Sequence, residues 1–103
     1  MAKAESIISK AIMDYVNSLP NYKIWRNQSG QIRVKGGGWM HLSPKGTPDL
    51  VGYTDTGQFI GIEVKTLTGT EEDHQTEFRE ACTGICITAT SVDEVKEWLQ
   101  KKN

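Results

Sequence analysis

A short polar turn between two β-rich stretches constrains the fold more than any other part of the chain. Residues 49–53 and 59–65 are rich in strand-forming side chains, and residues 54–58 read Thr-Asp-Thr-Gly-Gln between them. Gly57 can adopt positive φ without steric cost, so this pattern predicts an antiparallel hairpin folded about Thr56.

The hairpin register predicts which side chains face one another. The expected pairs are Tyr53 with Phe59, Val51 with Gly61, and Asp49 with Glu63. Directly opposed residues have Cβ atoms ~4.5–5.5 Å apart, and Lys65, two residues past Glu63, shares its sheet face. Opposed carboxylates repel, and a bound divalent cation would remove that cost. The other face of the second strand carries Ile60, Ile62 and Val64, which we interpret as core.

Length and composition predict one domain over residues 1–103, with 37% hydrophobic residues and enough bulk for one core. We expect no membrane span and no signal peptide. Cys82 and Cys86 are the only two cysteines, and we interpret them as reduced, mostly buried thiols. Together these features predict a cytoplasmic protein.

The net charge of −1 conceals a strong asymmetry along the chain. Residues 15–48 contain five basic side chains and no acid, whereas residues 49–103 carry a net charge of −6. A basic segment that leads into an acidic cluster is typical of a phosphate-binding surface beside a metal site. The alternative is a solvated loop whose charges only keep the protein soluble.

The N-terminal segment predicts an amphipathic helix over residues 2–19, ended by Pro20. Its apolar stripe comprises Ile8, Ile12, Tyr15, Val16 and Leu19, widened by Ile7 and Ala11. Glu5 falls inside the edge of this stripe at ~100° per residue. Two readings stay open, a third acid near the metal or a first-turn acid favoured by the helix dipole.

A glycine-rich segment follows the strand expected over residues 22–28. Residues 29–46 contain five glycines, and the Gly36-Gly37-Gly38 run predicts a mobile loop with a short strand near residues 31–34. The segment carries Arg33, Lys35, Trp39, His41 and Lys45. These residue types suit contacts with the DNA backbone and base stacking, although Trp39 could equally be a core residue.

The second half of the chain predicts a helix, a strand and a final helix. Thr70 is the expected N-cap of the first helix, which runs to about Cys82 with Phe78, Ala81 and Cys82 facing inward and stops at Gly84. The apolar run over residues 85–89 is typical of a buried strand. Ser91-Val92-Asp93-Glu94 is a capping box, and the last helix has a stripe of Val92, Val95, Trp98 and Leu99.

The predicted order is therefore helix, three strands, helix, strand, helix. A final strand reached through a helix should lie parallel to its neighbour, because the crossover returns the chain to the same edge. We expect an α/β fold in which a mixed central sheet is flanked by helices on both faces.

The pattern of short motifs resembles that of the PD-(D/E)xK nuclease superfamily. The matching string is Gly46-Thr47-Pro48-Asp49 … Gly61-Ile62-Glu63-Val64-Lys65-Thr66 … Gly69 … Gln75 … Phe78. It is most similar to the virus-type replication-repair nuclease (VRR-NUC) domain, and the likeness extends upstream through Trp25-Arg26-Asn27 … Gly30 and downstream through Thr83-Gly84-Ile85 … Ser91-Val92-Asp93-Glu94-Val95. The resemblance covers nearly the whole chain and implies a restriction-endonuclease-like core of order αβββαβα.

The resemblance implies hydrolysis of DNA phosphodiester bonds with Mg²⁺ or Mn²⁺. Asp49, Glu63 and the backbone carbonyl of Val64 would be metal ligands. Lys65 would hold or help to deprotonate the attacking water, and Gln75 would orient that water or a ligand. Glu5 matches an acid on the N-terminal helix of related nucleases. Residues expected to bind DNA are Arg26, Arg33, Lys35, Lys45 and Trp39.

The resemblance also implies a substrate and an assembly. Stand-alone phage-encoded members of the family are associated with homodimers that act on branched DNA, including four-way (Holliday) junctions, in DNA repair and replication. A domain of 103 residues has little room for base readout. We therefore expect a structure-selective endonuclease in the host cell cytoplasm. Two alternatives stay open, a non-catalytic DNA-binding or replication-accessory module, and a regulatory domain whose acidic face binds a protein.

Overall fold

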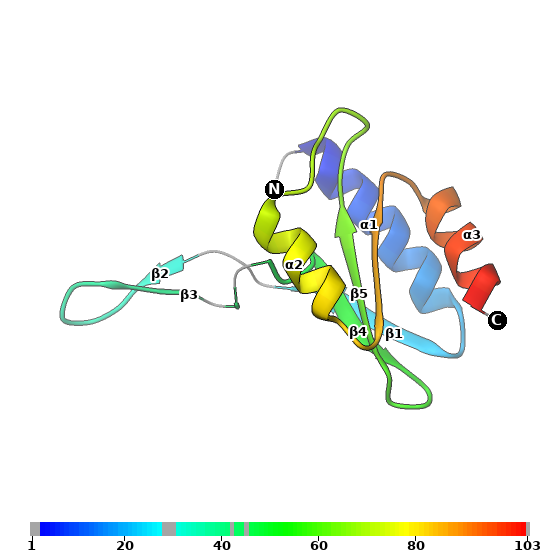
Figure 1. Ribbon diagram of the computed structural model, residues 1–103, viewed down its shortest axis with the longest axis horizontal. Helices are drawn as coiled ribbons and strands as arrows, with labels where there is room; N and C mark the ends of the chain where they lie inside the picture. The colour runs from blue at the N-terminus through cyan, green and yellow to red at the C-terminus, as the bar shows by residue number, and fades with distance from the viewer. Residues whose placement is uncertain (1–2, 28–30, 42, 45, 103) are drawn as a thin grey trace.

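The computed structural model describes residues 3–27, 31–41, 43–44 and 46–102 (Figure 1). Its elements in chain order are α1 (Lys3–Ser18), β1 (Tyr22–Arg26), β2 (Gln31–Arg33), β3 (Trp39–His41), β4 (Leu50–Thr54), β5 (Phe59–Val64), α2 (Asp73–Ala81), β6 (Ile85–Ala89) and α3 (Val92–Lys102). Without the β2–β3 pair, this order agrees with the prediction of helix, three strands, helix, strand, helix.

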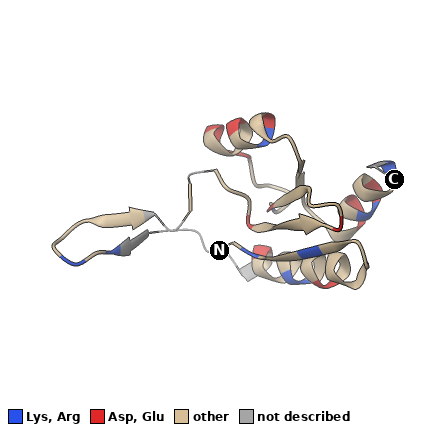
Figure 2. Ribbon diagram, turned by 90° about the horizontal axis from the view of Figure 1, so that it is seen from below, with Lys and Arg blue, Asp and Glu red and all other residues tan. Residues whose placement is uncertain are grey.

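The main sheet has four strands in the order β1-β4-β5-β6. Strand β4 runs antiparallel to both β1 and β5, whereas β6 runs parallel to β5. Helix α1 lies against one face of the sheet, and α2 lies over the opposite face (Figures 1 and 2). The predicted mixed α/β architecture, with a parallel last strand and helices on both faces, is confirmed.

The core lies between the sheet and the pair α1 and α3. Its buried members are Ile12, Val16, Ile24, Leu50, Ile60, Ile62, Val64, Ile85, Ile87, Ala89, Val95 and Leu99. In α1 the stripe is narrower than predicted. Ile12 and Val16 are fully buried, but Ile7 is 64% exposed and Ala11 is also exposed, so their assignment to the stripe is wrong. Both lie on the side of the helix that faces away from the sheet.

The predicted stripe of α3 is confirmed, since Val95 and Leu99 are buried and Val92 and Trp98 pack beside them. The cap before this helix differs from a simple capping box. The Ser91 hydroxyl accepts a hydrogen bond from the Glu94 N–H at 3.2 Å, as expected. The Glu94 carboxylate, however, accepts from the N–H of Thr90 at 2.8 Å.

The β4–β5 hairpin has the predicted register. Tyr53 pairs with Phe59 and Val51 pairs with Gly61, and Leu50 pairs with Ile62 at the end of the ladder. Gly57 has a φ of 82°, as the turn requires. Asp49 precedes the first paired residue of β4, so the same register sets it across from Glu63.

The glycine-rich segment forms a second hairpin where the sequence predicted a loop with one short strand. Strands β2 and β3 pair antiparallel and extend away from the main sheet, at the left of Figure 1. The Val34 N–H donates to the Gly38 carbonyl at 3.0 Å across the turn. The three glycines of the turn, residues 36–38, all have positive φ, a backbone conformation that residues with a Cβ rarely adopt. We call β2, β3 and this turn the arm.

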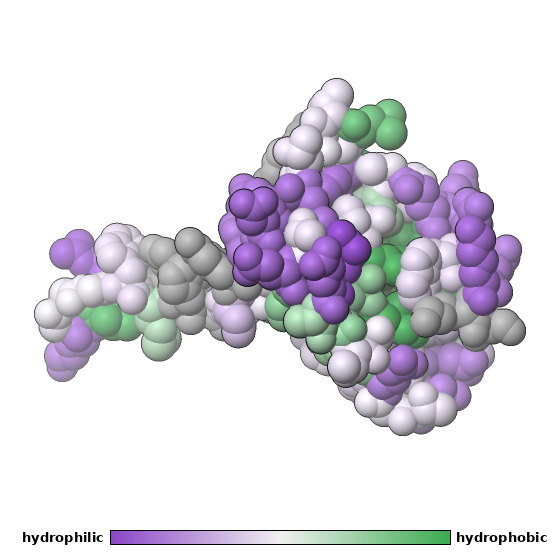
Figure 3. Space-filling view, in the orientation of Figure 1, coloured by the Kyte–Doolittle hydropathy of each residue, from purple (hydrophilic) through white to green (hydrophobic). Residues whose placement is uncertain are grey.

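Helix α2 begins later than predicted. Its N-cap is Glu72, not Thr70, because the Gln75 side chain closes a capping box by accepting from the Glu72 N–H at 2.9 Å. No residue of α2 is buried, and its outward surface is hydrophilic (Figure 3). Phe78 is half-buried against Phe59 with ring centroids 6.3 Å apart. Ala81 is exposed, so its predicted inward position is wrong.

The two cysteines form a disulfide, so the prediction of reduced thiols is wrong. The bond joins Cys82, the C-cap of α2, to Cys86 in β6. Its physical basis is tertiary, because α2 ends beside the strand that follows it and brings the two Cα atoms to 6.3 Å. Among the described helices, none combines the length and the apolar character needed to cross a membrane.

Candidate active site

Asp49, Glu63 and Lys65 come together on the sheet face that α2 partly covers. Strand β5 turns Ile60, Ile62 and Val64 into the core, so Glu63 and the residue after the strand, Lys65, lie on the opposite face. The carboxyl groups of Asp49 and Glu63 are hydrogen-bonded to each other. The Lys65 amine lies 4.0 Å from Glu63 Oε1. The hairpin register thus brings together the three residues that the sequence predicted.

Glu63 is buried with only 5% of its surface exposed, and this burial dominates its electrostatics. The pKa of the Glu63 carboxyl is raised from 4.5 to about 9. Removal from water is the largest cause of this rise, and the hydrogen bond to Asp49 and the negative charge of Asp49 also contribute to it. The positive charge of Lys65 acts in the opposite direction and is outweighed. At neutral pH Glu63 therefore keeps its proton and donates a hydrogen bond to the carboxylate of Asp49.

Asp49 is held in place by the backbone on both sides. Its Oδ2 accepts a hydrogen bond from the Val64 N–H at 2.9 Å, and its own carbonyl accepts from the Asn27 N–H at 2.8 Å. The segment that leads into Asp49 also packs tightly against α2. A Cβ added at Gly46 would lie 2.1 Å from the His74 carbonyl oxygen, so only glycine allows this approach. Asp49 is therefore positioned by three elements, β1, β5 and the start of α2.

Glu71 is a further acid near this site that the sequence analysis did not single out. Its carboxylate accepts from Thr88 at 2.9 Å, from Thr76 at 2.8 Å and from two guanidinium nitrogens of Arg79 at 3.0 and 3.2 Å. The Arg79 hydrogen bonds lower the pKa of Glu71 from 4.5 to about 2. Thr88 is the register partner of Glu63 in β6, which places Glu71 beside the acid pair. No local sequence pattern could have found this network, because its members lie on three separate segments.

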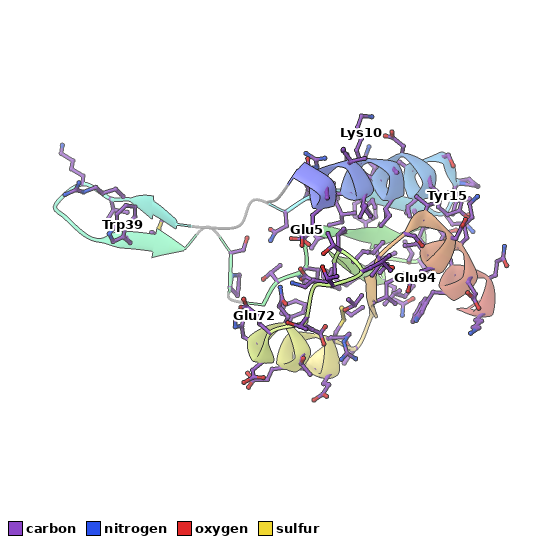
Figure 4. All side chains as sticks on the ribbon, turned by 90° about the horizontal axis from the view of Figure 1, so that it is seen from above. Glu5, Lys10, Tyr15, Trp39, Glu72 and Glu94 are labelled. Carbon is purple, nitrogen blue, oxygen red and sulfur yellow. A yellow bond between two sulfur atoms is a disulfide. The ribbon has the colours of Figure 1, made fainter. Side chains whose placement is uncertain are left out.

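Gln75 and Glu5, the other two residues predicted for the site, lie on α2 and α1. Gln75 is engaged in the capping box of α2 through its side-chain oxygen. Glu5 lies in the first turn of α1, half-buried, on the side of the helix toward the sheet (Figure 4). Among the described residues, no hydrogen bond or ion pair joins Glu5 to Asp49 or Glu63. Both readings of Glu5 therefore stay open.

The predicted DNA-binding residues fall in two places. Arg26, at the end of β1, is exposed and donates to the Ser6 carbonyl of α1 at 3.1 Å. Arg33, Lys35 and Trp39 lie on the arm, which carries basic residues without acids (Figure 2). Trp39 is 65% exposed, so the alternative that it belongs to the core is wrong (Figure 4). Lys45 lies outside the described residues.

The carboxylate oxygens of Asp49 and Glu63 are suitable ligands for a hard cation, but they are few. Within the part of the chain that the structure describes, no group of three or more His, Cys, Asp and Glu side chains is arranged to hold a metal ion. Asp49 and Glu63 supply two carboxylates, so a backbone carbonyl and water would have to complete the coordination, as is usual for Mg²⁺. Comparison with models of known protein families and with curated proteins finds no match.

Proposed function

We propose that this protein is a metal-dependent DNA endonuclease with a PD-(D/E)xK core, similar to the VRR-NUC domain and selective for branched DNA. The observation that carries the proposal is the buried Glu63, hydrogen-bonded to the half-buried Asp49, with the Lys65 amine 4.0 Å from Glu63. A carboxyl that is forced to keep its proton beside another carboxylate costs stability. Such a cost is expected at a site that is complete only with a cation.

The residues fit Mg²⁺ or Mn²⁺ as the missing partner. Asp49 and Glu63 offer hard oxygen ligands, and the Val64 carbonyl would add a third. When bound, the ion would polarise the scissile phosphate and lower the pKa of a bound water. The Val64 N–H holds Asp49 Oδ2 at 2.9 Å, and loss of the Glu63 proton would free the remaining lone pairs of the Asp49 carboxylate for the ion.

Lys65 supplies the positive charge that the reaction needs. Its side chain is only 16% exposed, so the ammonium group is shielded from bulk water. From that position it would orient the attacking water and stabilise negative charge that develops on the phosphate. The arm presents Arg33, Lys35 and the exposed ring of Trp39, which would hold a DNA strand outside the site. A homodimer would present two such sites to a two-fold junction.

A non-catalytic DNA-binding module with the same fold is the second candidate, and one observation favours it. Gln75, which the nuclease hypothesis assigns to orienting water, is occupied in the capping box of α2. In this module the protonated Glu63 would be a purely structural hydrogen-bond donor to Asp49. Its DNA binding would depend on salt but not on divalent cations.

The two candidates differ in a single experiment. Labelled four-way junctions, flaps, single strands and linear duplexes are incubated with the full chain in Mg²⁺, in Mn²⁺ and in EDTA. We expect cleavage that needs the cation and is fastest on the four-way junction, and its loss in Asp49→Asn. Binding of all four substrates without cleavage in either cation would reject the nuclease and leave the accessory module. Sedimentation of the same samples measures whether the active species is a dimer.

A further inference from the structure

The sheet face that carries the acid pair also carries two exposed aromatic rings. Trp25 in β1 is 45% exposed and Tyr53 in β4 is 52% exposed. Their ring centroids are 6.0 Å apart with planes inclined at 66°, an edge-to-face contact. Because the rings are not stacked on each other, each can offer a face to a planar ligand.

The register shows how these rings lie relative to the site. Side chains on one face of a strand recur every two residues, about 7 Å apart. On this face of β4 the order is Asp49, Val51, Tyr53, and Trp25 is the direct partner of Val51. Trp25 thus lies on the neighbouring strand, level with Val51, which is the next residue after Asp49 on this face. Tyr53 is the second residue after Asp49 on this face of β4. When a phosphate of a DNA strand is bound at Asp49, the adjacent nucleotide of that strand is therefore within reach of an aromatic side chain.

This half of the face is left open by the helices. Helix α2 reaches β5 through Phe78 and Phe59 and reaches β6 through the Cys82–Cys86 bond. The rings of Trp25 and Tyr53 lie on β1 and β4, beyond those contacts. Lys23, the direct partner of Tyr53, is exposed beside them and adds a positive charge. An aromatic surface with an adjacent amine suits a nucleobase and its phosphate.

We propose that Trp25 and Tyr53 form a stacking site for an unpaired nucleobase adjacent to the phosphodiester at Asp49 and Glu63. The proposal rests on the nuclease function and adds to it a substrate class. The preferred DNA would have a single-stranded or unstacked nucleotide next to the scissile bond, because a base within a duplex cannot place its face on these rings.

A second copy of this chain is a poorer occupant of the same surface. Two aromatic side chains of which about half is exposed offer on the order of 200 Å² in total. A stable interface buries ~800 Å² on each partner and excludes charge from its centre. The surface is too small and too close to the acid pair for such an interface, whereas a single base needs no more than one or two ring faces.

Binding to fluorescein-labelled dT15 and to a 15-base-pair hairpin duplex, measured by anisotropy in EDTA, tests the proposal. The variants are Trp25→Leu, Trp25→Phe and Tyr53→Leu. The matched control is Ile7→Ala, which removes an apolar side chain that is 64% exposed on α1. We expect Trp25→Leu to weaken dT15 binding roughly 5- to 100-fold, with duplex binding unchanged and Trp25→Phe near the wild type. The Ile7→Ala protein should bind both probes normally.

Tryptophan fluorescence keeps the proposal testable if Trp25→Leu does not fold. In a Trp39→Phe background, dT15 should quench emission, and the further change Trp25→Phe should remove that quenching. Unchanged emission on dT15 binding, or equal dT15 affinity in Trp25→Leu and wild type, would overturn the stacking site. A Trp25→Leu protein that changes only its oligomeric state would also overturn it.

The result separates this inference from the nuclease proposal. Cation-dependent cleavage by wild type combined with dT15 binding that ignores Trp25 would reject the stacking site and keep the nuclease. Binding of dT15 that depends on Trp25, in a protein that cleaves none of the branched or linear substrates, would reject the nuclease and keep a base-stacking surface.

Discussion

The carboxylate of Asp49 accepts a hydrogen bond from the backbone N–H of Val64 at 2.9 Å, so one acid is tied to the strand that carries the other. Glu63 precedes Val64 directly and is hydrogen-bonded to Asp49 through its side chain. The backbone hydrogen bond does not involve the Glu63 proton. The pair can therefore respond to pH or to a cation while the position of Asp49 stays the same.

Replacement of Lys65 by alanine should strongly reduce cleavage and leave folding intact. We expect kcat to fall by roughly 10²- to 10³-fold with KM for DNA within a few fold, because the proposed role of Lys65 is to stabilise developing charge and not to bind the DNA backbone. Single-turnover cleavage of the best substrate measures the effect. Lys101→Ala is the control, since Lys101 is 76% exposed and pairs only weakly with Glu97. Full activity in Lys65→Ala would refute the proposed role.

The metal-free protein should become less stable as pH rises, because of Glu63. Its pKa of about 9 in the folded state exceeds the ordinary value of 4.5, so between these limits the folded state binds more protons than the unfolded state. The stabilising contribution is complete below pH 4.5 and is lost up to pH 9. At pH 7, Glu63→Gln should be more stable than wild type by roughly 1–3 kcal/mol. Urea unfolding in EDTA at several pH values measures this, and parallel pH profiles would contradict it.

Binding of Mg²⁺ or Mn²⁺ should release a proton near neutral pH. The cation needs Glu63 ionised, and the raised pKa of that carboxyl means that the proton must leave first. We expect affinity to rise by up to tenfold per pH unit and to level off near pH 9. Calorimetry at pH 7 in two buffers of different ionisation enthalpy counts the protons released. Binding without proton release would show that the ion does not engage Glu63.

Arg79 should control the acidity of Glu71. Its hydrogen bonds lower the pKa of Glu71 to about 2, so the stability that Glu71 contributes is present above pH 4.5 and is lost as pH falls towards 2. Arg79→Ala should return the Glu71 pKa towards 4.5 and shift acid unfolding to higher pH. Carboxyl-detected NMR titration follows the change. Arg79→Lys keeps the charge and separates its effect from that of the paired hydrogen bonds.

Alanine at Gly46 should cost far more than alanine at Gly57. Both residues have nearly the same positive φ, 85° and 82°, so the backbone strain is matched. The Cβ at Gly57 would have no atom within 4 Å, whereas at Gly46 it would lie 2.1 Å from the His74 carbonyl. We expect about 1 kcal/mol of destabilisation for Gly57→Ala and at least ~2 kcal/mol for Gly46→Ala. Cleavage should fall only in Gly46→Ala, and equal losses in both variants would contradict the positioning of Asp49 through this contact.

Local patterns predicted the parts of the fold that depend on local chemistry. The Thr54–Gln58 turn set the β4–β5 register, and with it the meeting of Asp49, Glu63 and Lys65. The apolar spacing of α3 likewise identified its buried side. The stripe of α1 was predicted too wide, because periodicity alone does not say how far the sheet extends under a helix.

The features that the sequence did not predict depend on partners distant in the chain. Strands β2 and β3 have three residues each, which is too short for a clear alternation beside three glycines. Helix α2 begins later than predicted because the side chain of Gln75 forms a capping box with Glu72, so that Glu72 and not Thr70 is the N-cap. The Glu71 network and the cysteine pairing required the placement of α2 against β6, which no single segment encodes.

The apolar core lies on one face of the main sheet, and the candidate site lies on the other face. The buried apolar core lies on the side of the sheet that α1 and α3 cover, and α2 contributes no buried residue to it. Substitutions of the exposed side chains of α2 therefore threaten thermodynamic stability much less than substitutions in that core. A sheet organised in this way can exchange the recognition chemistry of one surface, residue by residue, while the interior that keeps it folded is inherited unchanged.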